Sequence, residues 1–224
     1  MKELLLIAGH GQGDSGAVGN GFSEANLTRE VIMLMEPYLK EYGIDYDTYG
    51  LVTKDNPTGK NMYKNGDAKN YTDYKQIMEV HFNSSTPSSS GIGTEVLIHQ
   101  DYINIPDNFD KAILTTLGKY WKNRGFKGRS DLANMNTYRR LKKSYRLIEV
   151  CFISDSKDMG IYKANKQVLA KDMSVDIAKF FNKNITSPTP PPVDPEKPTE
   201  PETPNDDKTY IVKNGTKIGH VEFY

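Results

Sequence analysis

The sequence has very little cysteine, which excludes one common way of stabilising a fold. Its 224 residues contain a single cysteine, Cys151, so no disulfide can form within the chain. Cys151 lies in the apolar run 148–153, where a small core residue is expected rather than a nucleophile. A chain of this length can bury a core large enough to fold without a covalent or metal staple.

An excess of charge of one sign is also missing. Lys and Arg together number 29, and so do Asp and Glu, so the net charge is zero. Because attraction to nucleic acid or to an anionic membrane surface relies on a basic excess, we expect no nucleic-acid partner. No apolar run approaches the roughly 20 residues of a membrane span, so we expect no membrane insertion.

The N-terminus lacks the features of an export signal. Its apolar run, residues 4–8, is shorter than the roughly 7–15 residues of a signal-peptide core. We therefore expect the protein to be made in a cytoplasm without a signal peptide of its own.

Proline is concentrated in one segment. Eight of the 12 prolines fall within residues 186–208, among Thr, Glu and Asp. This composition cannot build a core and favours an extended spacer, so we expect a main domain over 1–185, a Pro/Thr-rich linker over 186–208 and a short C-terminal segment over 209–224. In that last segment Asn214-Gly215 separates two strand-like runs and predicts a hairpin, which alone would be marginally stable in water.

Strand and helix patterns alternate along residues 1–185. The expected strands cover 2–8, 44–50, 76–83, 94–99 and 145–153, and the expected helices cover 27–42, 109–121 and 159–181. In the last helix the spacing places Ala164 and Val168 on the core face. The polar segment 51–71 is expected to be an exposed loop. The alternation predicts an α/β fold with a mostly parallel twisted sheet flanked by helices.

Two histidines and two glutamates occupy strand ends and a helix start. His10 follows the first strand between two glycines, His81 lies near the end of the third, and Glu149 interrupts the last. Glu24 precedes the apolar stripe of the first helix. Sites in mostly parallel sheets form at the carboxyl ends of strands. A zinc ion that does hydrolysis keeps about three ligands from His, Asp or Glu, and a further carboxylate carries the proton. The four residues fit such a site.

Each of these residues also has a plainer interpretation when taken alone. His10 could be an ordinary loop residue, and His81 a half-buried strand residue. Glu24 is favourable in a first helical turn through the helix dipole alone. Glu149 is the hardest to explain structurally, since a carboxylate in an apolar strand is costly or has a raised pKa.

The other two histidines are weaker candidates. His99 ends the strand 94–99 at a position that alternation would expose to solvent, and His220 lies beyond the linker on the expected hairpin.

Short motifs surround the four residues in a fixed order. They are Ala8-Gly9-His10-Gly11 with Asp14-Ser15-Gly16-Ala17 and Glu24, then Val80-His81-Phe82-Asn83, then Gly93-Thr94-Glu95-Val96, and finally Ile148-Glu149-Val150-Cys151-Phe152-Ile153-Ser154. Over residues 2–183 this series resembles the zinc-dependent N-acetylmuramoyl-L-alanine amidases of the AmiC/CwlV type.

The resemblance implies a role for each residue by its position. His10, Glu24 and His81 would hold one Zn²⁺, and Glu149 would be the catalytic acid/base. The implied reaction is hydrolysis of the amide between N-acetylmuramic acid and the L-alanine of the peptidoglycan stem peptide, by water that zinc activates.

Two positions depart from the pattern of that family. Ile7 stands where an acidic residue is common, and Ala25 stands where a basic residue is common. Neither position supplies a ligand, so the departures concern the support of the ligands rather than the metal itself.

The order of the parts resembles phage endolysins that act on Gram-positive hosts. Such an enzyme would be made in the host cytoplasm and would meet the peptidoglycan of the wall at lysis, with a holin involved only indirectly. Residues 209–224 would then be a hairpin or a truncated wall-binding module, and the oligomeric state stays open.

Other functions remain as alternatives. The nearest is a bacterial autolysin or sporulation amidase with the same chemistry. A metal-free glycosidase could use Glu24 and Glu149 as paired carboxylates, and a non-catalytic wall-binding module could keep the fold with an inactive site. Neither of these last two explains two histidines at strand ends.

Overall fold

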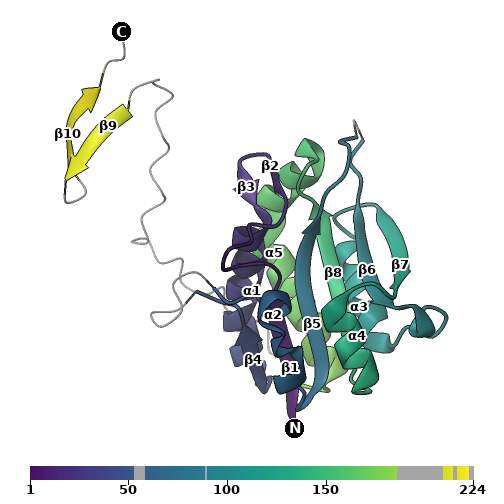
Figure 1. Cartoon of the computed structure of the whole chain (residues 1–224). Coiled ribbons are helices and arrows are strands. Elements are labelled where there is room, and N and C mark those ends of the chain that lie inside the picture. The colour runs from purple at the N-terminus through teal and green to yellow at the C-terminus, as the bar shows by residue number, and fades with distance from the viewer. Residues whose placement is uncertain (53–58, 89, 186–208, 214–215, 222–224) are drawn as a thin grey trace. The chain divides into compact units, whose positions relative to one another are not determined.

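The computed structural model describes residues 1–52, 59–88, 90–185, 209–213 and 216–221. The chain divides into two compact units, Met1–Thr189 and Pro190–Tyr224, which are described separately. The first unit is an α/β structure built on one sheet (Figure 1).

The sheet of the first unit has six strands in the order β4-β1-β5-β8-β6-β7. They are β1 (Lys2–Ala8), β4 (Tyr46–Tyr49), β5 (Tyr74–Asn83), β6 (Thr94–His99), β7 (Asn123–Arg129) and β8 (Tyr145–Phe152). All neighbouring strands run parallel except β6 and β8, which are antiparallel. The mostly parallel sheet predicted from the sequence is therefore confirmed.

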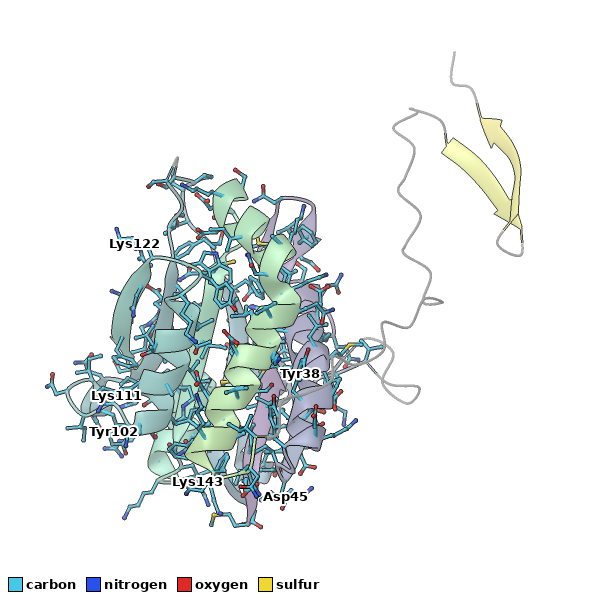
Figure 2. The ribbon with its side chains drawn as sticks, turned by 180° about the vertical axis from the view of Figure 1, so that it is seen from behind. Tyr38, Asp45, Tyr102, Lys111, Lys122 and Lys143 are labelled. Atoms are coloured by element: carbon cyan, nitrogen blue, oxygen red, sulfur yellow. The ribbon has the colours of Figure 1, made fainter. Side chains whose placement is uncertain are left out.

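Three long helices cover one face of this sheet. They are α1 (Glu24–Glu41), α3 (Asn108–Leu117) and α5 (Ser156–Phe180). Seen from that side, α5 runs along the face with α1 and α3 on either side of it (Figure 2). Leu4, Leu6 and Val80 point from the strands into the larger of two buried apolar clusters, which these helices complete. The period-2 alternation of the strands sets this face.

The opposite face carries two shorter helices, α2 (Met62–Asn65) and α4 (Ala133–Arg140), together with the 3₁₀ turn η1 (Asp67–Asn70) (Figure 1). The smaller apolar cluster lies here, and it joins Leu5 and Ile7 of β1 to Met62 and Met135 of the two helices. The remaining short elements are β2 (Val18–Gly19), β3 (Phe22–Ser23) and the 3₁₀ turn η2 (Gln100–Tyr102).

Two expectations about local structure were wrong, and two elements were missed. The segment expected to be an exposed loop over 51–71 contains α2 and η1, and it buries Met62 and Ala68. The strand β7 and the helix α4 were not anticipated. On α5, Ala164 and Val168 are exposed rather than buried, and Tyr162 packs into the core instead.

The described residues of the second unit form one pair of strands. Strands β9 (Thr209–Lys213) and β10 (Thr216–Val221) pair antiparallel, as the hairpin prediction required. The Asn214-Gly215 turn and the proline-rich segment 186–208 lie outside the described residues. The boundaries of the predicted linker therefore stay a prediction.

Within the described part of the chain, every helix is too short or too polar to cross a membrane.

Candidate metal centre

His10, Glu24 and His81 meet at the carboxyl-terminal edge of the sheet. One ligand atom from each lies within 4.8 Å of the other two. His10 follows β1, Glu24 is the first residue of α1, and His81 lies near the end of β5. Because β1 and β5 are neighbouring parallel strands, their carboxyl ends lie side by side and bring the two histidines together.

Close backbone approach at this edge depends on two glycines. A Cβ at Gly9 would lie 2.4 Å from His81 Nε2, and a Cβ at Gly16 would lie 2.7 Å from Glu24 Oε2. Gly16 also has a φ of +62°, a conformation that residues with a side chain rarely adopt. These glycines therefore allow the end of β1, the start of α1 and the two imidazoles to pack closely together.

Glu24 lies between the two imidazoles. Its Oε1 is 3.1 Å from His10 Nε2 and 2.9 Å from His81 Nδ1. The same carboxylate accepts hydrogen bonds from the backbone N–H groups of Phe82 and Ala17, each at 3.0 Å. Burial alone would raise the pKa of Glu24, but the hydrogen bonds with the histidines outweigh it and hold the pKa far below its usual range. Glu24 is thus an ionised, buried ligand candidate.

The second ring nitrogen of each histidine also faces a carboxylate. His10 Nδ1 lies 3.1 Å from Asp14 Oδ2, and His81 Nε2 lies 2.9 Å from Glu79 Oε1. Burial would lower the pKa of both imidazoles, but their carboxylate neighbours raise it overall. A carboxylate behind a histidine is the arrangement by which proteins orient the imidazole ligands of metals.

Glu149 lies on β8 directly across from His81 in the register of β5 and β8. Its Oε2 is buried and has no hydrogen-bond partner among the described residues. Burial raises the pKa of Glu149 to about 8, and the nearby carboxylates of Glu24 and Glu95 act in the same direction. A carboxyl group kept free of partners beside ligand candidates is suited to proton transfer.

All four predicted site residues line one groove. The groove has a volume of ≈ 260 Å³, and it is also lined by Ser84, Leu132 and Arg129. The structure thus brings together the four residues predicted for the site, with His10 just after β1, Glu24 at the start of α1, His81 on β5 and Glu149 on β8.

A second cavity of ≈ 320 Å³ adjoins the histidines on the α2 and α4 side. His10, Asp14, Glu79 and His81 line it together with residues of both helices. We refer to it as the α2/α4 cavity. Its lining includes residues 61–63 from the segment 51–71.

Sequence reasoning missed Glu79 and gave Asp14 no role of its own. Glu79 had a detectable signal, because it is a carboxylate inside an apolar strand, the same feature that drew attention to Glu149. His99 differs from its expected exposure, since only 13% of its side chain is accessible. It accepts a hydrogen bond from the backbone of Asp101 at η2 and does not join the cluster of three ligand candidates. Nothing is described of the His220 side chain.

The fold and the site together define an α/β protein with a candidate centre for one catalytic metal ion. Comparison with known proteins gives the family. Residues 4–179 match the family model described as N-acetylmuramoyl-L-alanine amidase, and the chain belongs to that family.

Individual relatives agree with this assignment. A probable autolysin of Staphylococcus aureus is 31% identical over 181 residues, which cover 76% of this chain and 37% of the autolysin. The endolysin of Bacillus phage SPP1 is 24% identical over 216 residues, which cover 95% of this chain and 77% of the endolysin. The chain therefore spans little more than a third of the staphylococcal relative.

A solved structure supports the same fold. The amidase AmiC2 of Nostoc punctiforme superposes with a TM-score of 0.64 at 19% identity, over 81% of this chain and 98% of that one. At this identity the similarity shows the fold alone.

Proposed function

We propose that this protein is a zinc-dependent peptidoglycan hydrolase that cleaves the amide between N-acetylmuramic acid and the L-alanine of the stem peptide. The observation that carries the proposal is the cluster of His10, Glu24 and His81 beside Glu149, whose Oε2 has no hydrogen-bond partner among the described residues, in a chain of the amidase family. A glycosidase that used Glu24 as an acid or base would not need its carboxylate placed between two imidazoles.

The donor set fits zinc. Two imidazole nitrogens and one carboxylate oxygen are ligands that Zn²⁺ accepts in catalytic sites, which keep about three protein ligands. His10 Nε2, Glu24 Oε1 and His81 Nδ1 are the atoms that would hold the ion. When bound there, zinc would lower the pKa of a water molecule and polarise the scissile carbonyl.

Glu149 supplies the proton transfer. Glu149 lines the groove shared with the three ligand candidates, and its Oε2 has no hydrogen-bond partner among the described residues, so its carboxylate can accept a proton from the attacking water and return it to the leaving amine of L-alanine. The raised pKa of about 8 reflects burial, and a cation on the neighbouring residues would favour the proton-accepting form. No other group is required to carry the proton.

Digestion of purified peptidoglycan with and without a chelator tests the reaction and its metal dependence together. We expect mass spectrometry to find stem peptides with a free L-alanine amine, and we expect the chelator to stop their release until zinc is restored. Undiminished release in the presence of chelator, or release of reducing sugars instead of amines, would contradict the proposal.

We further propose that the biological role is that of an endolysin acting on the wall of a Gram-positive host. The similarity to a phage endolysin over 95% of this chain supports this role. The 31% identity to a staphylococcal autolysin favours the alternative of a bacterial wall-remodelling amidase with the same chemistry.

Expression in a Gram-positive host separates the two roles. An endolysin made in the cytoplasm should leave cells intact until the membrane is permeabilised, when a holin or an added ionophore gives it access to the wall. Appearance of the active protein in the culture medium of growing, intact cells would favour the autolysin.

A further inference from the structure

We propose that Glu79 is a positioning residue that presents the Nδ1 atom of His81 to the metal. The inference rests on the proposed zinc site and concerns a residue to which neither the motifs nor the family gave a role. Glu79 lies in β5 two residues before His81, and only 5% of it is exposed. Its Oε1 lies 2.9 Å from His81 Nε2.

Glu79 is itself held by two side chains from other elements. Its Oε2 accepts a hydrogen bond of 2.6 Å from the hydroxyl of Tyr145 on β8 and one of 3.0 Å from Nδ2 of Asn134 on α4. Tyr145 is 9% exposed and Asn134 is 8% exposed. The carboxylate therefore has both oxygens engaged and little freedom to rotate, since its partners are fixed in a strand and a helix.

This arrangement sets the orientation of the imidazole. A neutral imidazole has one nitrogen that donates and one that accepts. When His81 is neutral and Glu79 accepts from its Nε2–H, the lone pair is on Nδ1, the atom that lies 2.9 Å from Glu24 Oε1 and would face the zinc. A carboxylate acceptor also makes the histidine a stronger ligand.

His10 has a comparable partner in Asp14, but the two carboxylates differ in access to water. The side chain of Asp14 is 27% exposed, whereas that of Glu79 is 7% exposed. Water can take over the role of Asp14 once that carboxylate is removed. Glu79 is the less exposed of the two carboxylates, and two side chains hold it in place, so replacing Glu79 should have the larger effect on metal binding.

Zinc affinity provides a test that does not depend on activity. The full chain and its variants would be loaded by titration against a chromophoric chelator of known zinc affinity. We expect Glu79→Gln to weaken zinc binding by about 10–100-fold, the usual cost of losing a carboxylate behind a histidine ligand. Tyr145→Phe and Asn134→Ala keep the charge of Glu79 and each removes one of the two donors to its Oε2, so each should weaken binding by less.

Tyr138→Phe is the matched control. Tyr138 stacks on Tyr145 with ring centroids 5.1 Å apart, but its hydroxyl bonds to Met62 Sδ and, within the described residues, makes no hydrogen bond to Glu79. This variant should bind zinc as the parent does. A loss equal to that of Tyr145→Phe would show that packing, and not the hydrogen bond to Glu79, controls affinity.

The Nε2 proton of His81 gives a spectroscopic readout that packing alone would not move. In the zinc-loaded parent we expect this proton as a hydrogen-bonded imidazole resonance in NMR, and we expect it to shift upfield in Glu79→Gln. Unchanged affinity and an unchanged resonance in Glu79→Gln would overturn the inference while leaving the zinc site intact. A parent protein that binds no zinc would instead overturn the proposed function.

If Glu79→Gln does not fold, zinc affinity and the His81 resonance are measured on the Tyr145→Phe and Asn134→Ala variants instead, and these two measurements decide the outcome.

Discussion

Two glutamates on neighbouring strands have opposite surroundings. The hydrogen bonds made by Glu79 outweigh its burial and hold its pKa below the usual range. Burial raises the pKa of Glu149 to about 8, and the Oε2 of Glu149 has no hydrogen-bond partner in the described part of the chain. Groups whose surroundings push their pKa values apart take different chemical roles. A carboxylate saturated with donors can only orient its neighbours, and one without donors is free to exchange a proton.

The variant Glu149→Gln separates proton transfer from metal binding. The substituted amide would have nearly the same shape as the carboxyl group but could not accept a proton, so we expect amidase activity to fall by about 10²–10⁴-fold. Zinc binding should persist, because Glu149 is not among the three ligand candidates. Released L-alanine amines and zinc content are the two measurements.

The exposed Glu41 at the end of α1 offers the control Glu41→Gln, which should keep full activity. Near-parental cleavage by Glu149→Gln would remove Glu149 from the mechanism. Loss of zinc in that variant would instead make Glu149 a ligand.

How far a sequence predicts such a site depends on the kind of signal each residue leaves. His10, His81 and Glu149 interrupt or end apolar strands, and a polar residue at a strand end is visible without a structure. The positions of their partners are not visible in this way. Ile7 is an example. It occupies a position where the family commonly has an acidic residue, but its partner in the register of β1 and β5 is Glu79, so a carboxylate is present on the neighbouring strand.

At the scale of elements, the N-terminus of α5 connects the helix layer to the site edge of the sheet. The buried side chain of Asp155 accepts hydrogen bonds of 3.0 Å from the backbone N–H groups of Lys157 and Asp158, and one of 2.8 Å from that of Ser88. Asp155 therefore caps α5 and also holds the backbone of Ser88, in the loop that follows β5, by a hydrogen bond.

Removing this cap should destabilise the fold. We expect Asp155→Ala to lower the free energy of unfolding at pH 7 by about 0.5–2 kcal/mol, the range for losing a helix N-cap. Urea unfolding followed by circular dichroism measures the change. Ser156→Ala, at the exposed neighbouring position, is the control and should have little effect. Equal stability of parent and Asp155→Ala would show that the cap contributes nothing.

The same variant should show a defined pH dependence. Burial alone would raise the pKa of Asp155, but the backbone hydrogen bonds outweigh it and lower the pKa below its usual value. A carboxylate with a depressed folded pKa stabilises the protein fully above its unfolded pKa of about 3.9 and loses that contribution as pH falls through the folded pKa. The stability difference between parent and Asp155→Ala should thus be constant near neutrality and shrink in acid. A difference that grew on acidification would contradict this account.

Prediction of elements succeeded where a pattern was long and failed where it was short. The strand β1 and the helix α1 have continuous or repeating apolar patterns, and both were expected close to their observed bounds. The helix α2 has only four residues and α4 only eight, too few to display a helical period. The strand β7 lies at the edge of the sheet and has no buried residue, so its sequence shows no apolar alternation.

At the scale of the whole molecule, the two apolar clusters draw all of their buried residues from positions 4–178. We therefore propose that residues 1–185 form the catalytic domain, that 186–208 link it to the C-terminal segment, and that 209–224 add a wall contact. The strands β9 and β10 have five and six residues, and a lone two-stranded pair is marginal in water.

A chain ending at residue 185 tests this division. We expect it to unfold at the same temperature as the full chain and to release amines from soluble muropeptides at the same rate. Binding to intact walls should be weaker, because the proposed contact is gone. Calorimetry, the amine assay and co-sedimentation with walls give the three values. A lower unfolding temperature would mean that the C-terminal residues belong to the domain, and equal sedimentation would remove their wall-binding role.

The fold class and the identity of the four central residues could be read from local patterns, because apolar periodicity and the polar residues that break it are properties of short stretches of chain. Only the folded molecule shows which nitrogen of each histidine faces the ligand cluster and that Glu79, Tyr145 and Asn134 stand behind His81. These contacts join residues as many as 66 positions apart. They depend on strand order, register and the placement of α4, which arise from packing of the whole domain and leave no periodic trace in the sequence.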